Sequence, residues 1–231
     1  MVSGKRALPL VIGGVAVALL VAVGVTIGLR PTAPEQGKTV AAPQEPTDAK
    51  GYLKRAALFR EAKDYDKAIA DEAKAIALDP TSATAHVERA YSYGAKHDFA
   101  AQIADDDAAI GLDAKNVAAF IDRSRAQYHK GDFDAALADA DRAIGLDPNA
   151  GAAYVARATA HDGKGDYEAA IADATMFLTH GQSSAAYDAR GLAYEKTGKT
   201  DKALADYQAA LATSPSDKIA KGALERLSAA H

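Results

Sequence analysis

Few side chains in this 231-residue sequence stand at spacings that could form a metal site or an active site. The six histidines form no His-x-x-His, no His-Glu-x-x-His and no pair four residues apart, the spacings that place two ligands on one helical face. The run Asp105, Asp106 and Asp107 lacks the rest of a calcium loop, and consecutive helical residues point about 100° apart, so we interpret it as a solvated acidic helix face. Cysteine is absent, and no Gly-x-Ser-x-Gly elbow occurs. We predict that the chain is not an enzyme and has no catalytic residue, metal site or cofactor.

Composition narrows the class of protein further. Apolar residues make up 48% and charged residues 25%, values that are typical of globular chains and exclude wholesale disorder. The formal net charge is -4, so the composition does not show the excess of basic residues that binds the phosphate backbone of a nucleic acid. We therefore expect no nucleic acid among the partners.

The N-terminal residues indicate a membrane anchor. A basic tail, residues 1–6, carries Lys5 and Arg6 and precedes an uncharged apolar run at residues 7–29. At about 1.5 Å per residue this run can cross the ~30 Å apolar core of a bilayer, and it exceeds the roughly 7 to 15 apolar residues of a signal peptide. We expect an uncleaved transmembrane signal anchor, with a cleaved signal peptide as the alternative. Gly24 and Gly28 leave weak homo-dimerisation of the anchor open.

A linker at residues 30–48 follows and holds four of the eight prolines. It predicts a tether between the membrane and a folded domain. The expected localisation is a single-pass protein of a bacterial inner membrane with its domain in the periplasm, or a periplasmic protein if the signal is cleaved.

The rest of the chain is built from one repeated unit. Similar segments at residues 64–80, 98–114, 132–148 and 166–182 recur every 34 residues, and a fifth at 199–215 follows after 33. Apolar residues fall at helical intervals in each segment, and prolines such as Pro80 end the helical pattern, so each unit is predicted to be two short helices joined by a turn. The predicted repeats are 49–82, 83–116, 117–150, 151–183 and 184–217.

These units resemble the tetratricopeptide repeat (TPR), a 34-residue helix-turn-helix, over residues 49–217. The matching large positions are Tyr52, His86, Phe120, Tyr154 and Tyr187, and the small positions four residues later are Ala56, Ala90, Ser124, Ala158 and Gly191. Gln102 and Phe177 depart from positions that are small in the other units. The resemblance implies an all-α, right-handed superhelical solenoid, and residues 218–231 are predicted to form a C-terminal capping helix.

Every unit also holds an Arg in its first helix and an Asp sixteen residues later. Because an antiparallel hairpin brings together positions equidistant from its turn, we predict a structural ion pair in each unit. An arginine ladder that grips anionic ligands is the alternative. The pairs are Arg55 and Asp71, Arg89 and Asp105, Arg123 and Asp139, Arg157 and Asp173, and Arg190 and Asp206.

The resemblance further implies a concave groove lined mainly by the first helices. The groove residues are expected to be Leu53, Val87, Tyr91, Ile121, Arg125, Tyr128, His129 and Val155. The alternative for the row Leu53, Val87, Ile121 and Val155 is ordinary packing between helices. The positions that hold a peptide carboxylate in chaperone-binding members are Leu53, Ala57, Glu88, Ala118 and Asp122 here, which favours a segment with apolar and basic residues over an acidic terminus.

The expected function is that of a membrane-tethered TPR scaffold that binds a protein or peptide partner in its groove, in an envelope assembly or secretion complex. The alternative is a structural oligomer joined through anchor helices and array ends, with no peptide ligand in the groove.

Overall fold

The computed structural model describes residues 45–179 and 181–229, which contain eleven α-helices and no β-strand. The prediction of an all-α solenoid is confirmed. The predicted anchor at residues 7–29 and most of the predicted linker lie outside the described residues. Within the described ranges, no helix has both the length and the apolar composition needed to cross a bilayer.

Ten of the described helices form five antiparallel hairpins, and one further helix packs on the last hairpin. The first helices are α1 (Ala49–Glu61), α3 (Ala83–Ala95), α5 (Val117–Lys130), α7 (Gly151–Lys164) and α9 (Ser184–Lys196). The second helices are α2 (Tyr65–Leu78), α4 (Phe99–Leu112), α6 (Phe133–Leu146), α8 (Tyr167–Leu178) and α10 (Thr200–Thr213), and the terminal helix is α11 (Lys218–Ser228).

Aspartates cap the start of the second helix in each of the first three hairpins. At the start of the second helices, the side chains of Asp64, Asp98 and Asp132 accept hydrogen bonds from backbone N–H groups three residues later. Such caps satisfy donors that a helix leaves unpaired at its first turn. The recurring Asp therefore explains why the second helices of the first three hairpins begin where the repeat predicts, whereas Asp166 and Lys199 at the same position of the last two hairpins make no side-chain cap.

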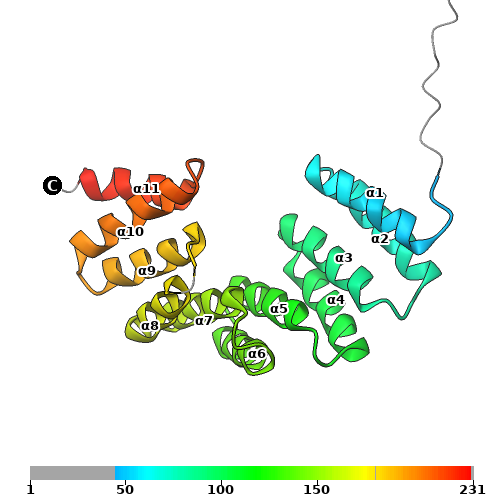
Figure 1. The fold of residues 1–231 in the computed structure, drawn as a ribbon, viewed down its shortest axis with the longest axis horizontal. Helices are drawn as coiled ribbons and strands as arrows, with labels where there is room; N and C mark the ends of the chain where they lie inside the picture. Colours follow the sequence, from blue (N-terminus) through cyan, green and yellow to red (C-terminus); the bar gives the residue numbers. More distant parts are fainter. Residues whose placement is uncertain (1–44, 180, 230–231) are drawn as a thin grey trace, which may run out of the picture. The chain divides into compact units, whose positions relative to one another are not determined.

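The hairpins stack in chain order (Figure 1). The second helix of each hairpin packs against the first helix of the next, and successive first helices also contact one another, as α5 contacts α7 and α7 contacts α9. Each hairpin thus buries its apolar face only against its neighbours, which is the packing of a solenoid. The first helices in the second half of the array are therefore close enough to line a common surface.

The core consists mainly of alanine. Ala68, Ala136, Ala170 and Ala203, at the same position of four hairpins, have no exposed surface. Small side chains let helix backbones approach closely. Where the second helix of a hairpin has a large residue, the facing residue of its first helix is small: a Cβ added at Gly94 on α3 would lie 2.5 Å from Oε1 of Gln102 on α4. This exchange explains how the departure at Gln102 is accommodated within the common fold.

Candidate functional site

The five Arg and Asp pairs are hydrogen-bonded ion pairs within their hairpins. In each pair the arginine Nε lies 2.6 to 2.8 Å from Asp Oδ2, and Nη2 lies 2.6 to 2.8 Å from Asp Oδ1. Two parallel bonds of this kind fix the geometry of a guanidinium as well as neutralising it. The predicted pairing therefore has a direct structural role in closing each hairpin.

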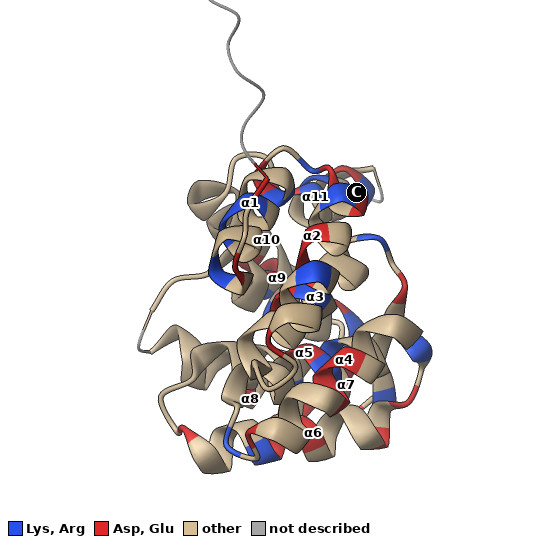
Figure 2. Cartoon of the chain, turned by 90° about the vertical axis from the view of Figure 1, so that its right-hand side faces the viewer, with Lys and Arg blue, Asp and Glu red and all other residues tan. Residues whose placement is uncertain are grey.

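Two of these arginines also join neighbouring hairpins. Nη1 of Arg123 donates to Asp107 at 2.5 Å, and Nη1 of Arg157 donates to Asp141 at 2.7 Å, both on the second helix of the preceding hairpin. Acidic and basic residues accordingly lie interspersed along the hairpins (Figure 2). Because these guanidinium groups are held between carboxylates, the geometry favours the structural role over a ladder that grips anions.

One groove among the described residues lies along α5, α7, α9 and the start of α11. It has a volume of about 580 Å³ and combines apolar, aromatic and charged side chains. Its lining residues include four that the sequence predicts for the groove, namely Arg125, Tyr128, His129 and Val155. The first helices of three successive hairpins thus contribute to one continuous surface.

The other four predicted groove residues lie elsewhere. Val87 and Tyr91 line a separate hollow of about 500 Å³ beside Arg60 and Glu88. Leu53 is half-buried on α1 and lines neither hollow. Ile121 is only 7% exposed and packs in a core cluster with Phe120 and alanines of α6 and α7, which matches the alternative of ordinary packing between helices.

Tyr128 and His129 lie at the junction between hairpins. The Tyr128 ring is 5.6 Å from the Phe133 ring, and burial raises the pKa of its hydroxyl, with the Asp162 carboxylate adding to the shift. His129 stacks on Phe99 of the preceding hairpin at 4.6 Å, and burial lowers the pKa of its imidazole. Both rings are therefore held in place by neighbours before any ligand arrives, which lowers the entropic cost of binding.

An acidic pair at the far end of the groove is absent from the prediction. Asp188 on α9 and Asp217 at the start of α11 both line the groove. Asp188 is 5% exposed, and burial, followed by the negative charge of Asp217, raises the pKa of Asp188 to about 7. The signal in the sequence is a break in the apolar row: after Val155, the 33-residue step leads to Asp188.

The run of three aspartates differs from the solvated helix face predicted for it. Asp105 is paired with Arg89, and Asp107 with Arg123. Asp106 has no exposed surface, and both of its carboxyl oxygens lack a hydrogen-bond partner among the described residues. Burial and the nearby Asp122 raise the pKa of Asp106 to about 8, so at neutral pH its carboxyl group is mainly protonated.

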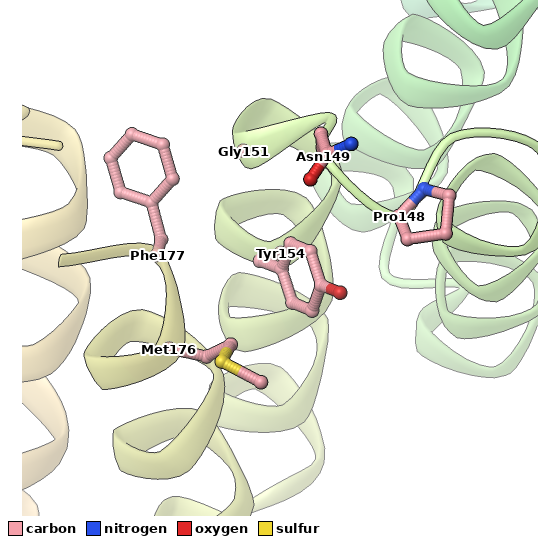
Figure 3. Close-up of a pocket in the computed structure, with 6 residues that line it drawn as sticks. All are labelled: Pro148, Asn149, Gly151, Tyr154, Met176 and Phe177. Carbon is pink, nitrogen blue, oxygen red and sulfur yellow. The ribbon is translucent and has the colours of Figure 1, made fainter. Parts of the chain in front are cut away.

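A smaller cavity of about 280 Å³ lies where α7 begins and α8 ends. Figure 3 shows its lining, which includes Tyr154, Met176 and Phe177 around the turn at Pro148. It contains no acidic or basic side chain, and its polar side chains are those of Asn149 and Tyr154. We therefore regard the longer groove as the candidate site.

Comparisons with known proteins agree with this architecture. The tetratricopeptide repeat family is matched by two sequence models, one over residues 121–185 and the other over residues 184–217. Residues 121–217 therefore match tetratricopeptide repeats. Comparison with the curated proteins gives no match.

Solved structures share the fold at low sequence identity. TTC0263, a thermophilic TPR protein of Thermus thermophilus, is 17% identical with a TM-score of 0.69, and the match covers 78% of this chain and 98% of that one. MamA is 23% identical with a TM-score of 0.56, covering 71% and 90%. YrrB, described as a TPR protein with an unusual peptide-binding site, is 21% identical with a TM-score of 0.53, covering 77% and 92%.

Proposed function

We propose that this protein is a scaffold or adaptor that binds a segment of a partner protein in the groove along α5, α7, α9 and α11. The observation that carries the proposal is the groove itself: about 580 Å³, bounded by Tyr128, Arg125 and apolar side chains such as Leu192. Tyrosine and arginine are the residue types that dominate binding energy at protein interfaces. The peptide-binding site named for YrrB gives a precedent within the fold.

In the proposed mechanism the protein binds a partner segment and catalyses no reaction on it. A segment lying along the groove would contact first helices from three hairpins at once, and each of these helices is held to the second helix of its hairpin by an Arg and Asp pair. Pre-ordered side chains make binding less costly than folding a surface around the ligand. The array then serves as a rigid frame that positions one partner.

We also propose that residues 7–29 anchor the protein in a membrane, with the repeats on the periplasmic side of a bacterial inner membrane. The support is the length of the uncharged run and the basic residues Lys5 and Arg6 before it. An envelope assembly or secretion complex is the setting that such a tethered scaffold would serve. A periplasmic protein released by signal cleavage is the competing proposal.

Replacing groove side chains tests the adaptor function. Tyr128→Ala and Arg125→Ala in the full-length chain should lose co-purifying partners after mild crosslinking, whereas Arg142→Ala should retain them, because Arg142 is exposed on α6 outside the groove. Thermal melts would establish that the variants remain folded. Identical partners for all three variants would contradict groove binding.

The second candidate function is a structural oligomer joined through anchor helices and array ends. It is motivated by Gly24 and Gly28 in the apolar run and by Ile219 on the terminal helix, which is 63% exposed. Light scattering of the full-length chain in detergent distinguishes the two functions. Association that rises with protein concentration and is unaffected by Tyr128→Ala would favour the oligomer.

A further inference from the structure

Asp188 occupies a position that is apolar in the four other hairpins. The equivalent residues are Leu53, Val87, Ile121 and Val155. Asp188 is 5% exposed, and its Oδ1 has no hydrogen-bond partner within the described part of the chain. A buried carboxyl oxygen without a partner lowers stability, and a valine of similar size would avoid this cost. The residue therefore calls for an explanation beyond the fold.

Asp217 lies beside Asp188, and its side chain is held in place because it caps the terminal helix. Its Oδ1 accepts hydrogen bonds from the backbone N–H groups of Ile219 at 2.9 Å and Ala220 at 3.3 Å, which makes it the N-cap of α11. The positive end of the helix dipole favours the ionised form of a capping carboxylate. The proton of the pair therefore resides mainly on Asp188, whose pKa is raised to about 7 by burial and then by the charge of Asp217.

The surroundings of the pair match a long side chain with a charged tip. Leu192 and Val155 line the same groove, and Ile219 stands at its edge with 63% of its surface exposed. Lysine and arginine have apolar stems that lie along such surfaces and cationic heads that pair with carboxylates. An acidic ligand would have fewer groups to pair with in this groove. The guanidinium of Arg125 lines the groove, but its Nη1 already donates to Asp122 at 3.0 Å.

We propose that Asp188 and Asp217 together bind the lysine or arginine side chain of a partner segment, whose neighbouring apolar residue lies against Leu192 and Ile219. This inference rests on the proposed function and names the chemistry of the partner. Before a ligand binds, the protonated Asp188 shares a hydrogen bond with the side chain of Asp217, and the cationic head would replace that proton between the two carboxylates. The stability lost to burying this carboxyl group is thereby explained as the cost of specificity.

Binding of the cation is coupled to loss of one proton. The carboxylic acid of Asp188 gives its proton to solvent, and the resulting carboxylate pairs with the ammonium or guanidinium group, so charge and protons balance. The titratable groups that act on Asp188 are Asp217 at the start of α11 and Tyr207 from α10, and Arg125, Tyr128 and His129 from α5 line the same groove. Between pH 6 and pH 8 the ionised fraction of Asp188 rises about tenfold, and affinity for a basic segment should rise by the same factor.

The test begins with a display library of random 12-residue peptides selected on the full-length chain in detergent. We expect selected peptides to contain Lys or Arg together with apolar residues. Their affinity, measured by fluorescence polarisation, should fall at least tenfold in both Asp188→Val and Asp188→Asn, and remain unchanged in Asp201→Asn, where an exposed aspartate of α10 is neutralised. Wild-type affinity should also rise about tenfold from pH 6 to pH 8.

The possible failures are distinguishable. Peptides that lose affinity in Tyr128→Ala but lack basic residues, or that bind Asp188→Val normally, would overturn the inference and leave the groove function standing. Selection of no peptide would overturn both. Absence of peptides together with self-association that Asp188→Val abolishes would assign the groove to a second copy of this chain, which also overturns the inference.

Discussion

The ring of Phe177 fills the space in which a side chain of residue 151 would lie. A Cβ added at Gly151 would be 1.9 Å from Cε2 of Phe177, and the two residues line the cavity in Figure 3. Phe177 replaces an alanine found in the other hairpins, and Gly151 makes room for it. One large residue and one absent side chain thus keep α7 and α8 at the spacing of the array.

This relationship predicts a strong coupling between the two positions. Gly151→Ala should lower the free energy of unfolding by roughly 1–3 kcal/mol because the added methyl group overpacks against the ring. Adding Phe177→Ala should remove the clash, so the double variant should lose less than the sum of the two single losses. Urea unfolding of the four proteins measures this cycle. Additive losses would contradict the proposed contact.

The ion pairs predict a different effect. Arg123→Met should lower the free energy of unfolding by about 2–4 kcal/mol, because it leaves Asp139, only 6% exposed, without its partner. Arg142→Met provides the matched control, since Arg142 is exposed on the adjacent helix α6. Chemical denaturation would compare the two variants. Equal, small losses would mean that the buried pair contributes little.

A pH dependence of stability follows from Asp106. Its pKa is raised from 3.8 to about 8 by burial first, then by Asp122, with smaller effects of Asp105 and Asp107 and an opposing one of Arg123. The folded chain holds a proton that the unfolded chain has lost, so this contribution is fully present below pH 4. It falls between pH 4 and pH 8 by on the order of 1 kcal/mol per pH unit.

Asp106→Ala tests that contribution, because alanine occupies the equivalent positions Ala140 and Ala174. The variant should be more stable than the wild type at pH 8, and the gain should shrink towards pH 5. Urea unfolding at both values provides the measurement. A gain that is independent of pH would show that Asp106 does not titrate in this range.

Left-handed backbone positions yield a further prediction. After α5, α7 and α9 the chain turns through glycines with positive φ, whereas after α1 the residue is Lys63 with φ of 60°. Lys63→Gly should raise the free energy of unfolding by about 0.5–1 kcal/mol, because a side chain is disfavoured in this conformation. Gly131→Ala should act in the opposite direction, since Gly131 has φ of 81° and open space around it. Melting temperatures that move in the same direction would contradict this view.

The periodicity of the sequence predicts the helices well because each hairpin repeats the same local signals. The Asp caps and apolar spacing lie within one unit, and the Arg and Asp pairs follow from the symmetry of a hairpin about its turn. Contacts between units are harder to predict. Whether Ile121 faces the groove or the core depends on how α5 sits against α6 and α7, which its own unit does not encode.

Contacts between units also determine the environment of two acidic residues, which the sequence did not predict. Asp106 is buried through the approach of the next hairpin, where Asp122 lies, and Asp188 meets Asp217 from the terminal helix. Aligning the fifth unit with its 33-residue step would have revealed Asp188 as an exception in an apolar row. The pairing with Asp217 required the three-dimensional structure.

Photo-crosslinking in cells tests groove binding most directly. A photoreactive phenylalanine would replace Tyr128 in the full-length chain, and in a matched control it would replace the exposed Arg142 on α6. We predict a discrete adduct with another protein from position 128, none from position 142, and loss of the adduct when Asp188→Val is added. Adducts only between copies of this chain, or the same adducts from both positions, would contradict binding of a partner in the groove.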